Sequence, residues 1–255
     1  MEFSRQGGTF VRNVSRLDLI RLFVFGMLLI LPAASGAQQL PPLAEQMAKT
    51  YGLDSFGQVE GIRYTFNLDL PGLNLKRSET WEWDPKTDTV TYEGKDKEGQ
   101  PVKASYQRSQ LSSQSDAIKK DIDPAFANDQ YWLLLPFHLV WDGAAVTDDG
   151  MQKLPLGDAS AQRVVMKYPS QGGYAPGDTW EFYVGADKRI EAIVYHRGGT
   201  GKPSIVIATW ADHKQAGPLL ISTDHRGTAD GKPVRVSLSD VSVKVTGSEN
   251  WMNAQ

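Results

Sequence analysis

The residues with the widest chemical range in this sequence are its four histidines, and their spacing argues against a metal centre. His138, His196, His213 and His225 lie far apart, and no two of them have the H-x-H, H-x-x-x-H or H-E-x-x-H spacing that directs two imidazoles at one metal ion. We therefore expect structural or surface roles for all four. The sequence predicts no metal ion and no other cofactor.

Other catalytic motifs are also missing from the sequence. No G-x-S-x-G nucleophile elbow occurs. The glycine-rich stretch 198–202 is not a phosphate loop, because His196 occupies the first glycine position and Pro203 follows the lysine where serine or threonine is needed, so we interpret it as a hairpin turn. Aspartates at 84–88 and 148–150 fit turns, with a calcium site as the alternative. We predict no catalytic residue, although a pair of carboxylates for glycoside hydrolysis depends on a spatial separation that a sequence does not give.

The positive signal is apolar and aromatic. Each large aromatic residue taken alone is best explained as core, but together they would line the concave side of a curved sheet and leave space for a lipid-sized ligand. The predicted cavity residues are Trp81, Trp83, Tyr131, Trp132, Leu134, Leu135, Phe137, Trp141, Trp180, Phe182, Tyr195 and Trp210.

The elements that must position these residues are mostly strands. From Ile62 to Leu70, apolar and polar residues alternate with the period of two that is typical of a half-buried strand. About ten such segments, separated by short turns rich in glycine, proline and aspartate, predict an antiparallel meander. The other predicted strands are 75–83, 89–92, 102–107, 162–168, 179–184, 189–196, 204–210, 219–225 and 234–245.

One segment, residues 108–142, breaks this rhythm and predicts a helical insert. Asp123 and Pro124 form a helix start, and the later part, Trp132 to Trp141, is apolar with only Pro136 and His138 between its apolar residues. We interpret the apolar part as a lid that packs into the empty cavity, with Pro136 as its hinge.

A second, short helix is predicted before the first strand, since Leu43, Met47 and Tyr51 recur at four-residue spacing after a proline. With about two helices available, a strongly curved sheet closed by those helices is the economical way to cover its apolar face. The predicted fold is therefore mainly β, within the α+β class. It is a curved antiparallel sheet or unclosed barrel of about 10–11 strands, with helices plugging the open side.

Composition narrows the functions further. The 255 residues contain no cysteine, which excludes a disulfide framework, a cysteine-ligated metal and a cysteine nucleophile. The formal net charge of −3 gives no excess of positive charge that would bind nucleic acid.

Residues 1–37 have the order of a secretory signal peptide. Arginines precede the apolar run 22–31, Pro32 ends it, and a triplet of small residues follows. A membrane span needs about 20 apolar residues, so a permanent anchor is the minority alternative. We predict cleavage between Ala37 and Gln38, export, and a single half-barrel domain over residues 38–255.

Two aromatic motifs and the order of the elements carry a family resemblance. The motifs are Tyr131 to Phe137 and Pro176 to Val184, supported by the strands of Tyr195 and Trp210. They resemble the Lol-type (LolA/LolB-like) carrier superfamily, which sorts lipoproteins across the bacterial periplasm, over residues 40–246. The resemblance implies a periplasmic protein with an unclosed barrel, plugging helices, and an apolar cavity that accepts acyl chains without catalysis.

We therefore expect an exported protein that binds hydrophobic ligands, with lipid or acyl chains as partners. Lipoproteins or another envelope protein are further partners, and membrane contact is transient at most. Two alternatives stay open. One is an envelope sensor or scaffold of the same fold that binds another protein, and the other is an exported enzyme that acts on polysaccharides, because aromatic platforms also stack on sugars.

Overall fold

The computed structural model describes residues 40–96, 98–172, 175–199 and 201–255. They belong to one compact unit. The predicted signal peptide and its cleavage site lie outside the described residues. Among the helices that are described, none has the length and apolar character needed to cross a membrane.

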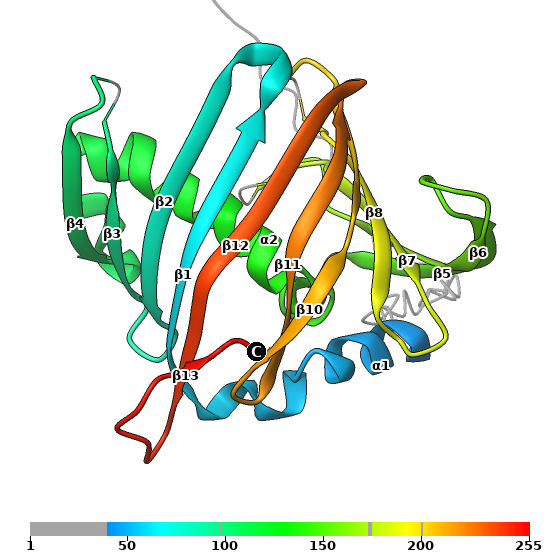
Figure 1. The fold of residues 1–255 in the computed structure, drawn as a ribbon, viewed down its shortest axis with the longest axis horizontal. Coiled ribbons are helices and arrows are strands. Elements are labelled where there is room, and N and C mark those ends of the chain that lie inside the picture. The colour runs from blue at the N-terminus through cyan, green and yellow to red at the C-terminus, as the bar shows by residue number, and fades with distance from the viewer. Residues whose placement is uncertain (1–39, 97, 173–174, 200) are drawn as a thin grey trace, which may run out of the picture. The chain divides into compact units, whose positions relative to one another are not determined.

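The described residues contain thirteen strands in one antiparallel sheet (Figure 1). The sheet order is β4-β3-β2-β1-β12-β11-β9-β8-β7-β6-β5, with β10 paired to β11 and β13 paired to β12. The strands are β1 (Val59–Leu70), β2 (Leu75–Asp84), β3 (Thr89–Lys95), β4 (Pro101–Gln107), β5 (Ala145–Lys153), β6 (Ser160–Lys167), β7 (Thr179–Val184), β8 (Ile190–His196), β9 (Ile205–Thr209), β10 (Ala211–Ala216), β11 (Leu219–Ala229), β12 (Lys232–Val245) and β13 (Met252–Asn253).

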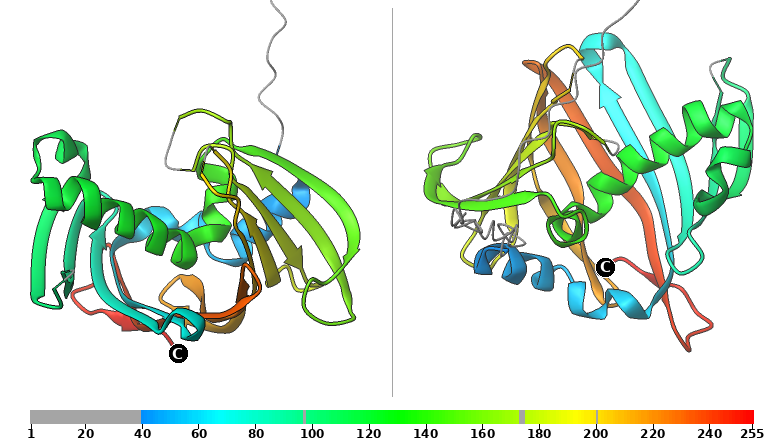
Figure 2. Two further views of the ribbon diagram at one scale, coloured as in Figure 1. Left: turned by 90° about the horizontal axis from the view of Figure 1, so that it is seen from above. Right: turned by 180° about the vertical axis from the view of Figure 1, so that it is seen from behind.

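The sheet is built from two meanders that meet where β1 pairs with β12. Strands β4 and β5 stand at opposite ends of the order and do not pair, so the sheet is not closed. Figure 2 shows that the sheet is strongly curved. The predicted curved, unclosed antiparallel sheet is confirmed. The number of strands is higher than predicted, because β5, β10 and the two-residue β13 lack a clear alternating pattern.

Strand β1 shows why the alternating residues define the concave face. Ile62, Tyr64 and Phe66 are buried, whereas Arg63 between them is exposed. In the register with β2, Tyr64 stands opposite Trp81, so large side chains from neighbouring strands meet on one face. Cross-strand pairs of this kind are the unit of sheet stabilisation.

Strands β9 and β10 lie on either side of Trp210, and both pair with β11. Here Gly227 of β11 faces β9 so closely that a Cβ atom would lie 1.8 Å from the carbonyl oxygen of Ile207. A side chain of any size would force the two strands apart. The glycine therefore permits the close approach of β9 and β11.

Helices cover the concave side of the sheet (Figure 2). Helix α1 (Pro42–Thr50) precedes the sheet, and α2 (Asp123–Trp141) lies between β4 and β5, after a 3-10 segment, η3 (Arg108–Ser113), and a π-helical turn, η4 (Ile118–Ile122). Helix α2 is kinked at Leu134, where φ is −120° and ψ is 20°. The cause is Pro136, which lacks a backbone N–H and crowds the preceding turn. The predicted hinge thus lies beside a kink.

Candidate ligand-binding cavity

A cavity of about 440 Å³ lies between the concave face of the sheet and α2. Strands β1, β7, β8, β9, β11 and β12 contribute its curved wall, together with the ends of the loops that join them. Its lining residues are Phe66, Leu68, Leu70, Pro124, Ala127, Asn128, Tyr131, Trp132, Ala175, Asp178, Trp180, Tyr195, Arg197, Ser204, Val206, Ala229, Val234 and Val236.

The helical wall follows from the period of α2. Its lining positions are Pro124, Ala127, Asn128, Tyr131 and Trp132, and this spacing places them on one face of the helix. Two of the five are the small residues proline and alanine. The space is therefore left open by short side chains on the helix, while larger apolar residues face it from the strands.

The structure divides the twelve predicted cavity residues into two groups. Tyr131, Trp132, Trp180 and Tyr195 line the cavity. The other eight do not. Six of these are core residues with at most 2% of their surface exposed, namely Trp81, Leu134, Leu135, Phe137, Phe182 and Trp210. Trp83 is partly buried against the core, and Trp141 is 38% exposed.

Sequence reasoning did not select several lining residues. Leu68 and Leu70 belong to the alternating face of β1, so the signal was present but was not used. Ala127 gives no signal, because an alanine in a helix is ordinary in any environment. Asp178 and Arg197 border loops, where alternation does not indicate which way a side chain faces.

A buried polar cluster fixes the N-terminal half of α2 to the sheet. Asp129 is completely buried and contacts the guanidinium of Arg77 on β2. Its carboxylate also accepts hydrogen bonds from Trp81 Nε1 and Asn128 Nδ2, both at 3.0 Å. Burial raises the pKa of Asp129 to about 7, while Arg77 acts in the opposite direction.

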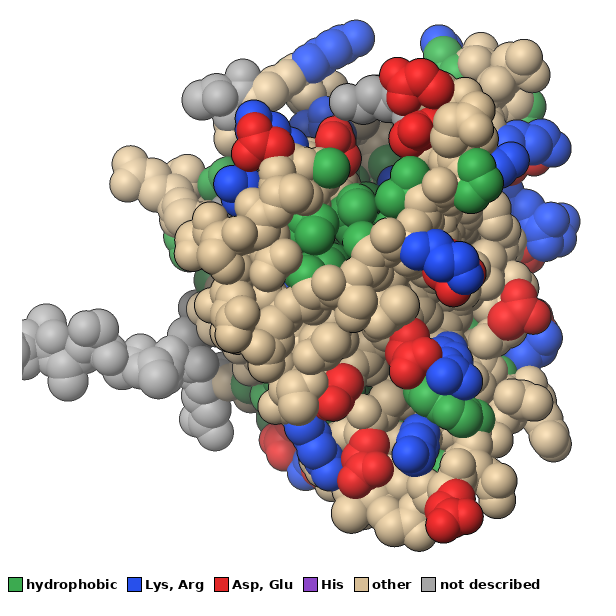
Figure 3. Space-filling model, turned by 90° about the vertical axis from the view of Figure 1, so that its left-hand side faces the viewer, with side chains coloured by type: hydrophobic (Ala, Val, Ile, Leu, Met, Phe, Trp, Pro, Cys, Tyr) green, Lys and Arg blue, Asp and Glu red, His purple; other side chains and the backbone are tan. Residues whose placement is uncertain are grey.

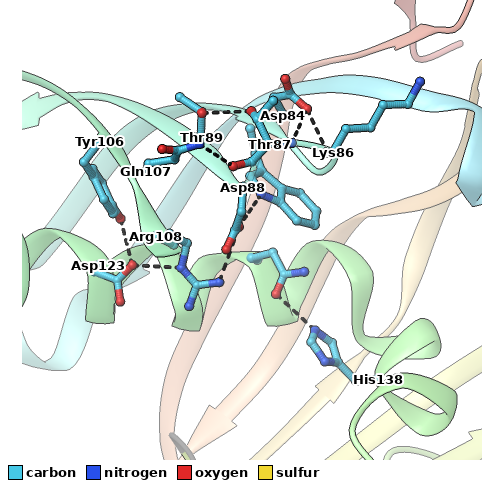
Figure 4. A network of polar contacts seen from close by, with 12 residues as sticks. Asp84, Lys86, Thr87, Asp88, Thr89, Tyr106, Gln107, Arg108, Asp123 and His138 are labelled. Atoms are coloured by element: carbon cyan, nitrogen blue, oxygen red, sulfur yellow. Dashed lines mark hydrogen bonds and ion pairs between the residues drawn. The ribbon is translucent and has the colours of Figure 1, made fainter. Parts of the chain in front are cut away.

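A second cluster anchors the start of α2, as Figure 4 shows. Asp123, also completely buried, accepts hydrogen bonds from Arg108 Nε at 2.9 Å and from the Tyr106 hydroxyl at 3.1 Å. Arg108 in turn lies 3.8 Å from Asp88, in the turn between β2 and β3. Two buried carboxylates on the same helix therefore hold the cavity wall in place.

Polar contacts also orient Tyr131 in the cavity wall. Its ring stacks on His138 with 3.8 Å between centroids, and its hydroxyl donates to Asp142 at 2.6 Å. His138 Nε2 lies 3.0 Å from Gln130 Oε1, and His138 Nδ1 lies the same distance from the Asp142 carboxylate. This network spans the kink of α2, so it links the two halves of the helix.

The side of the cavity formed by β7 and β8 carries charged and hydroxyl groups. The buried carboxylate of Asp178 accepts hydrogen bonds from the Tyr195 hydroxyl at 2.8 Å and from the Gly198 backbone N–H at 2.7 Å. Burial raises the pKa of Tyr195 to about 12, Asp178 adds to the rise, and Arg197 opposes it. The exposed Arg197 makes no ion pair with any residue that the structure describes.

An aromatic cluster with unpaired polar atoms extends from the cavity wall into the core. Trp132 stacks on Trp210 at 6.0 Å, and both rings contact the buried His225. Within the described ranges, Trp180 Nε1, Trp210 Nε1 and both ring nitrogens of His225 are buried without a well-formed hydrogen bond. Burial lowers the pKa of His225 to about 3, so the ring is neutral at pH 7.

Apolar side chains are also exposed to solvent on the side of the unit where β4 lies. Hydrophobic side chains gather there in a hollow, and lysine, arginine, aspartate and glutamate side chains surround it (Figure 3). Across the described part of the chain, no group of three or more histidine or carboxylate side chains is placed to hold a metal ion.

No family model and no curated protein matches the chain. Several solved structures are similar to it, among them the following three. A DUF1329 family protein from Desulfovibrio piger is 12% identical, with a TM-score of 0.42, over 81% of this chain and 92% of that one. A LolA superfamily protein from Nitrosomonas europaea is 8% identical, with a TM-score of 0.43, over 78% and 92%. The lipoprotein LppX from Mycobacterium tuberculosis is 7% identical, with a TM-score of 0.27, over 77% and 95%.

Proposed function

We propose that this protein is an exported carrier that binds lipid or acyl chains in the cavity between the sheet and α2, without catalysis. The observation that carries the proposal is the cavity itself. It has a volume of about 440 Å³ and is walled by aliphatic and aromatic side chains from six strands and one helix. That volume lies in the range of about 300–1,000 Å³ typical of small-molecule sites.

The physical basis is the hydrophobic effect. At about 30 Å³ for each small group, the cavity holds roughly 15 groups the size of a methylene. Each buried methylene contributes about 0.8 kcal/mol, so a chain of that length gains roughly 12 kcal/mol. Association costs about 4–15 kcal/mol, and binding therefore requires most of the chain to be buried. The cavity is therefore expected to discriminate between ligands by the length of their acyl chains.

A chain-length series tests this proposal. Straight-chain fatty alcohols compete with a fluorescent fatty acid, and we expect affinity to rise about fourfold for each added methylene. The rise should stop near the length that fills the cavity, roughly 15 carbons. Equal affinity for short and long chains would contradict the proposal.

A cavity-filling variant supplies the matched structural test. Ala127→Phe places a ring where α2 faces the cavity, so we expect it to displace long chains and weaken their binding at least tenfold. Ala117→Phe is the control, since Ala117 is an exposed helical residue outside the cavity wall. Native mass spectrometry of the exported protein should also detect bound lipid. Equal binding by both variants would refute the assignment.

The lid role of the apolar end of α2 remains a prediction. Leu134, Leu135 and Phe137 lie in the core and not in the cavity wall, so a lid movement would have to rotate them out of the core. We propose that such movement occurs about the kink beside Pro136, because the N-terminal half of α2 is held by Asp123 and Asp129.

A further inference from the structure

One charged side chain in the cavity wall stands apart from the others. The acids near this end of the cavity are occupied by fixed donors. Asp178 accepts from Tyr195 and Gly198, and Asp230 accepts from Ser204 Oγ at 3.1 Å and from the backbone N–H of Ile205 at 2.8 Å. No ion pair joins Arg197 to any described residue, and its guanidinium interacts only with the neighbouring Tyr195 hydroxyl among the groups of this wall.

Trp180 provides an unused donor in the same wall. Its side chain is 5% exposed, and its Nε1 is buried with no hydrogen-bond partner among the residues described. An unpaired buried donor is costly, so most are satisfied by protein, water or ligand. Trp180 contacts Tyr195, with 4.5 Å between ring centroids, and both line the cavity with Arg197. A cation without an ion-pair partner and an unpaired N–H donor thus border one apolar space.

We propose, on the basis of the proposed carrier function, that the ligand is a single-chain amphiphile with an anionic head, a carboxylate or a phosphate, that binds at Arg197. The chain lies along the apolar wall formed by Leu68, Val206 and Val236. The guanidinium offers a planar fork of donors that matches both kinds of oxyanion. The cavity volume corresponds to one chain of roughly 15 carbons, which excludes a ligand with several full-length chains inside it.

The test compares probes that share one chain and differ in the head. Palmitate, 1-hexadecanol and a lysophosphatidic acid with a 16-carbon chain are titrated against the full exported protein, with inorganic phosphate as a probe without a chain. We expect palmitate or the lysophosphatidic acid to bind at least tenfold more tightly than hexadecanol. The tighter of the two identifies the head. Binding of inorganic phosphate alone at a comparable affinity would overturn the assignment of a lipid head.

Arg197→Gln is the decisive variant. It should weaken binding of the anionic amphiphile about tenfold and leave hexadecanol within twofold. Lys202→Gln is the matched control, because Lys202 is a neighbouring exposed cation that does not line the cavity. An equal loss in both variants would mean general attraction to positive charge and would overturn the role of Arg197.

The outcomes separate this inference from the carrier function. If all amphiphiles bind equally well and Arg197→Gln changes none of them, the anionic head is refuted and the apolar cavity stands. If neither palmitate nor hexadecanol binds, the carrier function itself is refuted. Arg197 is exposed, so its variant is expected to unfold at the wild-type temperature, and circular dichroism checks this.

Discussion

His225 offers a direct test of how the core behind the cavity is built. Its ring lies on β11, is 1% exposed, and packs 4.0 Å from Trp210 and 5.4 Å from Trp132 between centroids. Burial lowers its pKa from 6.5 to about 3, although the backbone of Thr209 and Ser222 acts in the opposite direction. The imidazole therefore occupies the position of an aromatic core residue, and His225→Phe preserves that packing.

The sign of the pH effect follows from linkage. Below pH 6.5 the unfolded chain takes up a proton at His225, whereas the folded protein stays neutral there until about pH 3. The stability that the neutral ring gives is complete above pH 6.5 and is lost as the pH falls toward 3. At pH 4 the difference of about 2.5 pH units corresponds to roughly 3 kcal/mol.

Urea unfolding, followed by circular dichroism at pH 7 and pH 4, measures this effect. We expect His225→Phe to lie within about 1 kcal/mol of the wild type at pH 7 and to be more stable by about 3 kcal/mol at pH 4. His196→Phe is the control, because the His196 side chain is 40% exposed and lies 2.9 Å from Glu181. It should gain no stability at pH 4.

Two results would refute the reasoning. A difference between His225→Phe and wild type that is the same at both pH values would mean that the buried ring does not resist protonation. A loss of more than about 3 kcal/mol at pH 7 would mean that the imidazole makes a hydrogen bond that phenylalanine cannot replace.

Two further substitutions test the elements that hold the cavity. Asp129→Ala leaves Trp81 Nε1 without its acceptor and leaves Arg77 with only Glu79, at 3.5 Å, so it should destabilise the protein by about 2–3 kcal/mol in urea unfolding. Removal of the exposed Asp116 side chain should change little, and similar effects of the two substitutions would contradict the anchoring of α2. Gly227→Ala should cost about 1–3 kcal/mol in thermal unfolding, because its Cβ would meet the Ile207 carbonyl, and Gly57→Ala, where the space is open, is the control. An unchanged midpoint for Gly227→Ala would show that β9 and β11 can separate freely.

Strands β5 and β10 were not predicted from the sequence, because neither has an alternating pattern of apolar and polar residues. Edge strand β5 is mostly exposed and carries a register irregularity between Asp148 and Met151, so no alternation marks it. Strand β10 is short and largely polar, so it also lacks an alternating pattern. A strand that buries neither face leaves no period-two signal, because that signal is produced by burial of one face.

The amino-acid sequence by itself determined the periodic features of this protein. Alternation in β1, the break at residues 108–142 and the proline in α2 are consequences of local geometry, and they predicted a curved antiparallel sheet with helices on its open side. Trp180 and Phe182 mark the limit of this reasoning. They share one face of one strand, yet Trp180 lines the cavity and Phe182 is in the core.

Only the tertiary structure decided that difference. The pairing of β1 with β12 joins residues as far apart in the chain as Val59 and Val245, and the cavity exists because this pairing curves two meanders around α2. The placement of Arg197 beside an apolar space depends on the same long-range contacts. Side chains with identical local patterns acquire different surroundings because their neighbours come from distant segments, whose positions are set by the packing of the whole sheet.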